Sequence, residues 1–405
     1  MSAVHTRMAA VVPPVVPFVQ KLAGEHPGTL SLAQGMVFFG PPNALLERVL
    51  TRLLPDDARY GAVEGDRSLR EAYAAHLTAL HGYPQAGLAD RLYMVSGANA
   101  GFLQAILCLS APDDEVILFE PFYFNHEMAI RIAGCTPRVL PRSALDEPDL
   151  ATLNAAIGPR TRAVVTVSPN NPTGETLTRE TLERVNQFAA TRGIFHISDE
   201  AYDELVFGDI PHTAPAARLG ADAHTIAIYS MSKSFGMAGF RLGCVVLPER
   251  LKDDFCKVGD TNLICPARVV QRVGTTLLEQ WQSERRALIA RVGEQRATLC
   301  ERLAARLPHM LDYPSTGALY LWLPLPAGVD PMQATRELIA QEGVAVLPGS
   351  AFHVEGSETS PPRIRVSFGG VSGRDFTRAC DRLLTGLERL HEAAAPEPIH
   401  VSGNL

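Results

Sequence analysis

The sequence predicts an α/β fold, with a three-layer large domain around a mostly parallel sheet and a smaller α+β domain. From about residue 90 onward, short and almost wholly apolar runs alternate with amphipathic stretches. This is typical of parallel strands whose two faces are both covered by helices. After about residue 266 the pattern changes to a long helical tract and then three further apolar runs. We therefore assign residues 46–285 to the large domain, and residues 1–45 and 286–405 to the small domain.

The elements follow from these patterns in chain order. The apolar runs predict large-domain strands at residues 92–96, 115–119, 162–168, 194–198, 225–230 and 241–247. Amphipathic stretches between them predict helices at residues 99–110, 125–134 and 179–193. The later helical tract covers residues 269–307, and small-domain strands follow at 318–325, 344–348 and 363–368, with a closing helix at 374–393. The N-terminal arm leads into a short helix and is expected to pack with the small domain.

Composition and charge exclude several classes of function. A net charge of −7 on 405 residues gives no field that would attract nucleic acid or an anionic membrane surface. Three prolines interrupt the apolar stretch at residues 9–19, so it predicts neither a signal sequence nor a membrane span. The seven cysteines show no metal-ligand spacing, which favours reduced thiols in a cytoplasmic protein without a metal site. Small-molecule chemistry becomes the leading expectation.

One lysine stands out. Among 37 basic residues only four are lysines, and Lys233 lies among small and apolar residues in SMSKSFGMAGFRLG, residues 230–243. Arginine keeps its proton, whereas a desolvated lysine can become a neutral amine that attacks a carbonyl group. A lysine that forms a Schiff base is one interpretation. A surface lysine whose alkyl chain lies along apolar neighbours is the other.

Two loops at the carboxyl ends of predicted strands can contact an anion or a polar ligand. Ligands of open parallel sheets bind at this edge. Ser96–Asn99 opens a helix, so the backbone of Ala98 and Asn99 can hold a phosphate, although a tight strand–helix turn needs the same small residues. In Ser168–Gly174, two prolines and a glycine hold Asn171 in a rigid loop, which can also be a capped turn.

Two further strand ends and one strand interior carry charged groups. Asp199 directly follows an apolar run, where a carboxylate is ion-paired, caps a helix, or holds a proton on a ligand. Ser230 and Arg241 can donate to a phosphate on either side of Lys233. Arg365 lies inside an apolar strand, which suits bidentate capture of a carboxylate, unless the side chain is partly exposed. A phosphate cradle, a carboxylate and an amine are what pyridoxal 5'-phosphate requires.

The motifs at these positions identify a family resemblance that covers nearly the whole chain. It resembles the class I/II aminotransferases of the fold type I pyridoxal-phosphate enzymes. The order and specificity of the motifs carry the resemblance: LSLAQG (30–35), YGAVEGDRSLREA (60–72), SGANAG, EPFYFNH, NNPTG, SDEAY, SMSKSFGMAGFRLG and RVSFG.

The resemblance implies roles for individual residues. Lys233 would bind the cofactor as a Schiff base and move the substrate Cα proton, and Asp199 would keep the pyridine nitrogen protonated. Arg365 would bind the substrate carboxylate, with help from Asn171 and the backbone near Gly35. The remaining implied cofactor contacts are Tyr202 and Asn171 at the ring oxygen, Tyr123 on the ring face, and Ala98, Asn99, Ser230, Arg241 and the partner subunit's Tyr60 at the phosphate of a homodimer.

The expected reaction moves the amino group of a neutral L-amino acid, aromatic or methionine-like, to a 2-oxo acid. The apolar loop Met36–Phe39 would wall the substrate pocket, and NNPTG favours transamination. Gly239–Arg241 has the phenylalanine common in aminocyclopropane-carboxylate synthases, which favours elimination or replacement as the alternative. Arg268 would pair with an acidic group of a substrate or belong to an interface. A non-catalytic effector-binding module of a transcription regulator is less favoured, because the first 45 residues show no helix-turn-helix pattern.

Overall fold

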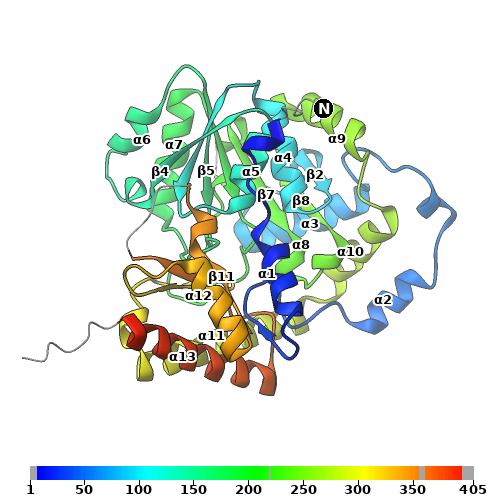
Figure 1. The fold of residues 1–405 in the computed structure, drawn as a ribbon. Helices are drawn as coiled ribbons and strands as arrows, with labels where there is room; N and C mark the ends of the chain where they lie inside the picture. The colour runs from blue at the N-terminus through cyan, green and yellow to red at the C-terminus, as the bar shows by residue number, and fades with distance from the viewer. Residues whose placement is uncertain (1–6, 219, 355–360, 395–405) are drawn as a thin grey trace, which may run out of the picture.

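A seven-stranded sheet forms the centre of the protein in the computed structural model, which describes residues 7–218, 220–354 and 361–394 (Figure 1). Only β8 runs antiparallel to its neighbours, so the sheet is mostly parallel, as the sequence predicts. In sheet order the strands are β2 (Leu92–Val95), β8 (Gly243–Val246), β7 (Thr225–Ser230), β6 (Phe195–Asp199), β5 (Thr161–Val167), β3 (Glu115–Glu120) and β4 (Thr136–Pro141).

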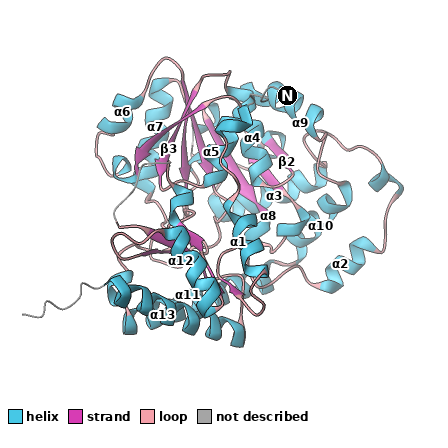
Figure 2. Ribbon diagram, viewed as in Figure 1, coloured by secondary structure: helices cyan, strands magenta, loops and turns pink. Residues whose placement is uncertain are grey.

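Helices cover both faces of this sheet, which makes three layers (Figure 2). Alternate strand residues point to opposite faces: Val116 and Leu118 pack in one apolar cluster, whereas Ile117 and Phe119 pack in another. The first face is covered by α4 (Ala98–Leu109), α5 (Phe124–Ile132) and α9 (Lys252–Asn262). The second is covered by α3 (Arg67–His81), α6 (Ala151–Ala156), α7 (Arg179–Arg192) and α10 (Arg268–Gln280). Burial on both faces explains why these strands are apolar throughout.

Two smaller sheets lie below the large one in Figure 1. One is antiparallel, in the order β11 (Leu347–Pro348), β12 (Arg363–Ser367) and β9 (Tyr320–Pro324), and the other pairs β1 (Leu30–Ser31) with β10 (Val344–Ala345). The other helices are α1 (Val15–Gly24), α2 (Asn43–Leu50), α8 (Met231–Ser234), α11 (Gln282–Arg306), α12 (Pro331–Glu337) and α13 (Gly373–Ala394). No helix of the described residues is long and apolar enough to cross a membrane.

We propose that the chain divides into domains at residues 46–285 and at 1–45 with 286–405. The N-terminal arm supports this division, because β1 pairs with β10 and α1 contacts β10 and β11. The apolar face of α13 packs in one cluster with β9 and β12.

The structure differs from the expected strands in four places, the first of which is the short strand β1, which the sequence does not predict. The expected elements do not include β4, whose two prolines weaken the strand pattern and are tolerated because β4 is an edge strand. The last large-domain strand is antiparallel because residues 231–242 fold back at the end of β7 and return the chain from the same edge, where Ser230 pairs with Gly243. The single strand expected at 344–348 is divided between two sheets, as β10 and β11.

Helix α3 provides a test of the packing. Leu77 is fully buried against the sheet and Leu80, one turn further along, is 43% exposed. Leu77→Ala is expected to lower the free energy of unfolding by about 2–5 kcal/mol, because it removes buried methyl groups and leaves a cavity. Leu80→Ala in the same helix is the matched control and should cost well under half as much in a denaturant titration. Equal losses would contradict the assigned face of α3.

Candidate active site

Lys233 lies in the short helix α8, directly after β7 at the carboxyl edge of the sheet. It is partly buried, and its Nζ donates a hydrogen bond to the carbonyl oxygen of Gly35. Burial, followed by the nearby Arg365 and Arg241 guanidinium groups, lowers the pKa of Lys233 to about 8. The interpretation as an ordinary surface lysine is therefore wrong. About a tenth of this amine is then neutral and nucleophilic at pH 7, far more than for a lysine in water.

Arg241 and Gly97 form an anion cradle beside Lys233. Gly97 has φ +86°, and a Cβ atom at this position would lie 2.0 Å from Nη2 of Arg241. The Arg241 guanidinium also donates to Ser232 Oγ at 3.3 Å. The helix α4 begins at Ala98, and the first backbone N–H groups of a helix have no partner within it. Ser230 caps α8 at the same edge, so phosphate donors from three segments lie close together, and the lack of a side chain at Gly97 makes room for the Arg241 guanidinium.

Asp199 ends β6 and is 5% exposed. One carboxylate oxygen lies 2.9 Å from Nε2 of His126, and the other accepts a hydrogen bond from the Ala201 backbone N–H at 3.0 Å. The His126 ring stacks on Phe102 at 4.0 Å between centroids. Asp199 is thus held in a fixed orientation by a buried imidazole. His126 did not emerge from the sequence as a site residue, because nothing in EPFYFNH shows that α5 passes beneath β6.

Three aromatic residues surround the space between Lys233 and Asp199. Burial raises the pKa of Tyr123, and a hydrogen bond to Asn99 opposes that shift, so these two predicted cofactor residues are in contact. The Tyr202 ring centroid lies 5.8 Å from Nζ of Lys233. The Tyr202 hydroxyl lies 2.6 Å from the hydroxyl of Tyr320, a residue of β9 that sequence reasoning did not identify.

Arg365 is 2% exposed, so the alternative of a partly exposed strand arginine is wrong. Its guanidinium donates to the Asn171 side-chain oxygen at 2.8 Å and to the Ala33 carbonyl. Its Nε has no hydrogen-bond partner, and no carboxylate pairs with it, among the described residues. A buried cation without a counter-ion is costly. The position therefore suits a ligand that brings its own carboxylate.

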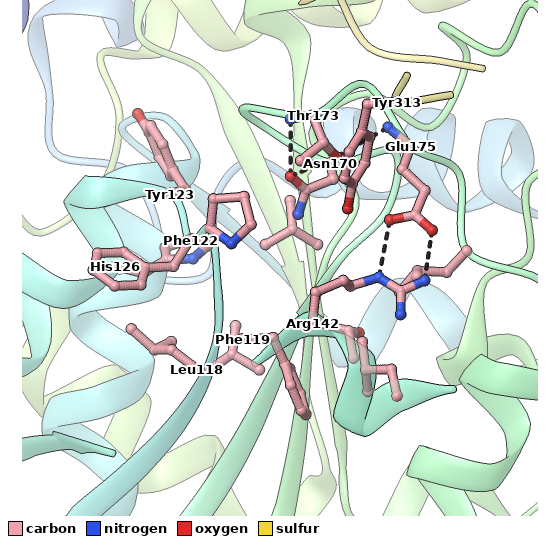
Figure 3. A pocket seen from close by; sticks show the side chains of 16 residues that line it. Leu118, Phe119, Phe122, Tyr123, His126, Arg142, Asn170, Thr173, Glu175 and Tyr313 are labelled. Atoms are coloured by element: carbon pink, nitrogen blue, oxygen red, sulfur yellow. Dashed lines mark hydrogen bonds and ion pairs between the residues drawn. The ribbon is translucent and has the colours of Figure 1, made fainter. Parts of the chain in front are cut away.

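A small cavity is lined by Asn170 and Thr173 of the loop Ser168–Gly174 and by residues of the neighbouring strands (Figure 3). Tyr123 and His126 line one side, and an ion pair between Arg142 and Glu175 lies on the other, with Nε and Oε2 2.9 Å apart. Its volume of about 30 Å³ holds about two water molecules at most, and no cofactor. The cavity therefore lies among residues that surround and hold the site, such as Tyr123 and His126.

Two predicted residues lie away from this cluster. Tyr60 is 85% exposed, on the segment after α2 that extends from the body of the molecule in Figure 1. Arg268 forms an ion pair with Asp66 at 3.2 Å and donates to the Asp56 carbonyl at 2.9 Å. The remaining predicted residues are brought together at one edge of the large sheet: Gly35, Ala98, Asn99, Tyr123, Asn171, Asp199, Tyr202, Ser230, Lys233, Arg241 and Arg365.

Comparison with known proteins agrees with this arrangement. The chain matches the family model of aminotransferase class I and II over residues 28–383. It is 30% identical to the aromatic aminotransferase ISS1 of Arabidopsis thaliana, over 93% of this chain and 94% of that protein. It is 31% identical to the arginine–pyruvate transaminase AruH of Pseudomonas aeruginosa, over 80% and 82% respectively. The aspartate aminotransferase structure from Thermotoga maritima matches with a TM-score of 0.84 at 26% identity, over 95% of this chain and 100% of that one.

The chain therefore belongs to the class I and II aminotransferases, which are pyridoxal-phosphate-dependent transferases with the type I fold. The residues present fit that cofactor. The Arg241 guanidinium, which packs against Gly97 at the start of α4, suits the cofactor's phosphate, the buried carboxylate of Asp199 suits a protonated ring nitrogen, and Lys233 supplies the amine.

The cradle can be tested at its glycine. Gly97→Ala is expected to weaken cofactor binding roughly 10- to 100-fold, because the new Cβ displaces Arg241, and a charge-assisted hydrogen bond contributes about 1.5–3 kcal/mol. A spectroscopic titration of the protein with pyridoxal phosphate measures this. Gly28→Ala is the matched control: its φ of +85° imposes the same backbone strain, but no atom lies within 4 Å of the added carbon. Equal weakening by both would refute the steric argument.

The lowered pKa of Lys233 predicts a pH dependence. Capture of pyridoxal phosphate needs the neutral amine, so its rate should be small below pH 8 and level off above it. Arg365→Met removes a nearby positive charge that lowers this pKa, so the midpoint should move to higher pH. Stopped-flow absorbance measures the midpoint for the wild type and for Arg365→Met. The titration of pyridoxal phosphate itself affects both midpoints equally, so it does not change the difference between them. A midpoint unchanged by Arg365→Met would contradict the electrostatic coupling.

Proposed function

We propose that this protein is an aminotransferase that moves the amino group of a neutral L-amino acid, aromatic or methionine-like, to a 2-oxo acid. The observation that carries the proposal is the pairing of Lys233 with Arg365: an amine with a pKa near 8 beside a buried guanidinium that has no carboxylate partner among the described residues. An amino acid offers the complementary groups on one carbon atom. Its carboxylate binds Arg365, and its Cα then faces Lys233.

Each residue contributes a defined step. Asn171 and the Ala33 carbonyl orient the Arg365 guanidinium, and with it the substrate carboxylate. The Lys233 amine would accept and hold the proton that leaves the substrate Cα. When bound, pyridoxal phosphate withdraws electrons from Cα. Positioned acid–base catalysis of this kind contributes roughly 10²–10⁴-fold to the rate.

The proposed substrate class rests on the wall of the pocket. Phe38 and Phe39 pack edge to face at 5.5 Å, three and four residues after Gly35, whose carbonyl accepts from Lys233. Gly236 keeps this loop close to α8, since a Cβ there would lie 2.4 Å from the Phe39 carbonyl oxygen. Arg268, the candidate for an acidic side chain, is already neutralised by Asp66. The Arg291 guanidinium lies 5.0 Å from the centroid of the Phe38 ring, so the support for a neutral side chain comes from the apolar rings of Phe38 and Phe39 themselves.

Elimination or replacement, which Gly239–Arg241 suggested, is not favoured. The relatives described above are an aromatic aminotransferase, an arginine–pyruvate transaminase and an aspartate aminotransferase. Their names differ in substrate and agree in reaction, so they support transamination more strongly than they support any one amino acid.

We also propose a cytoplasmic homodimer in which Tyr60 completes the phosphate site of the partner subunit. Tyr60, Leu53 and Leu263 are 85%, 66% and 54% exposed. Large exposed apolar groups of this kind often mark an interface. The seven cysteines are all free thiols, which supports a reducing compartment.

The deciding experiment supplies the cofactor-loaded protein with one amino acid at a time and no oxo acid. Phenylalanine, tyrosine and methionine should each release one equivalent of the matching 2-oxo acid per site, as measured by mass spectrometry. Aspartate and arginine should release it at least 10-fold more slowly, because the rings of Phe38 and Phe39 offer their charged side chains no ion pair. Release of the side-chain leaving group together with ammonia, and of a 2-oxo acid that lacks this group in place of the matching one, would support elimination, and preference for aspartate would contradict the substrate class.

A further inference from the structure

Tyr320 occupies the contact between the two halves of the proposed site. It lies on β9 of the small sheet and is 1% exposed. Its hydroxyl is 2.6 Å from that of Tyr202, which follows β6 of the large sheet. Its ring lies beneath the Arg365 guanidinium, with the guanidinium carbon 4.2 Å from the ring centroid. One side chain thus touches both the cofactor tyrosine and the carboxylate arginine.

The surrounding backbone leaves Tyr320 little freedom. A Cβ on Gly35 would lie 1.9 Å from the Tyr320 hydroxyl, so the hydroxyl packs directly against that glycine. The Tyr320 carbonyl accepts a hydrogen bond from the Ser315 hydroxyl at 2.6 Å, and a Cβ on Gly174 would lie 2.4 Å from the same oxygen. Two glycines and a serine therefore hold this tyrosine from both ends.

The number of protons on each hydroxyl decides which of the two tyrosines donates the hydrogen bond between them. A phenol has one proton to donate and can accept others. Burial, with Tyr320 as the next cause, keeps the pKa of Tyr202 well above its usual range, so Tyr202 remains a donor. If Tyr202 donates its proton to the cofactor ring oxygen, the bond between the two hydroxyls must be donated by Tyr320.

We infer that Tyr320 is a positioning residue for the reaction: its hydroxyl donates to Tyr202 and strengthens the bond that Tyr202 gives to the cofactor, and its ring holds Arg365 in place for the substrate carboxylate. The inference rests on the proposed function of this site. It assigns two separable effects to one side chain, because the hydroxyl acts on the cofactor and the ring acts on the substrate.

Two substitutions separate these effects. Tyr320→Phe removes the hydroxyl and keeps the ring under Arg365. The cofactor oxygen then loses part of its donor and becomes more basic, so the pKa of the bound chromophore should rise by about half a unit, with KM nearly unchanged. Tyr320→Leu also removes the ring, and KM should rise roughly tenfold for every amino acid accepted, since a buried cation–π contact is lost.

The matched control is a second buried tyrosine pair. The hydroxyls of Tyr83 and Tyr229 lie 2.9 Å apart in the apolar cluster that α3 and α10 form with the sheet, and Tyr83 is 2% exposed. Tyr83→Phe removes one hydroxyl from an equivalent pair and should leave both the chromophore pKa and KM unchanged. Comparing the unfolding temperatures of Tyr83→Phe and Tyr320→Phe separates lost stability from lost positioning.

The experiment is a pH titration of the visible absorbance of the cofactor-loaded protein, without amino acid, for the wild type, Tyr320→Phe, Tyr202→Phe and the double variant. Tyr202→Phe should raise the chromophore pKa more than Tyr320→Phe, and the double variant should match Tyr202→Phe alone, because Tyr320 acts through Tyr202. Additive shifts, or no shift in Tyr320→Phe, would overturn the inference. If Tyr202→Phe itself leaves the chromophore pKa unchanged, then Tyr202 does not bind the cofactor ring oxygen. That outcome would show that the proposed site, and not only the role of Tyr320, is wrong.

Discussion

Three basic side chains lie close together at one edge of the sheet: Lys233, Arg241 and Arg365. Their mutual repulsion is the constraint that the rest of the site must offset. Among the described residues, only the carboxylate of Asp199 raises the pKa of Lys233, whereas both arginines lower it. The site therefore carries excess positive charge. A phosphate beside Arg241 and a carboxylate beside Arg365 would balance it, and the amine that lies between them is the group that loses its proton most readily.

The backbone makes this convergence possible at a few strained points. Gly97 and Gly236 both have positive φ, and a side chain at either position would collide with Arg241 or with the Phe39 carbonyl. Arg241 itself has φ +54°, which a residue with a Cβ adopts at a cost of about 1–2 kcal/mol. Strain of this kind persists where surrounding structure holds it, as at ligand sites. Here it turns the guanidinium back toward the start of α4.

His126 and Tyr320 show that the residues which hold the site in place come from elements far apart in the sequence. His126 comes from α5 and holds Asp199, while Tyr320 comes from β9 and contacts Tyr202 and Arg365. Neither is close in sequence to the residue it supports. Because a small shift of either would move a reacting group, both couple the packing of distant elements to the chemistry.

Residue patterns by themselves predicted the α/β class, most of the strands from residue 92 onward and the candidate cofactor residues. Apolar strands and rare residue types such as the isolated Lys233 are local features, and the strand ends that carry them meet at one edge in any parallel sheet. The edge strand β4, the reversed direction of β8 and the division of residues 344–348 between two sheets were decided by tertiary pairing. So were the burial of Arg365, the ion pair of Arg268 and the contacts of His126 and Tyr320. These depend on which segments meet in space, and their local sequences carry no signal of that meeting.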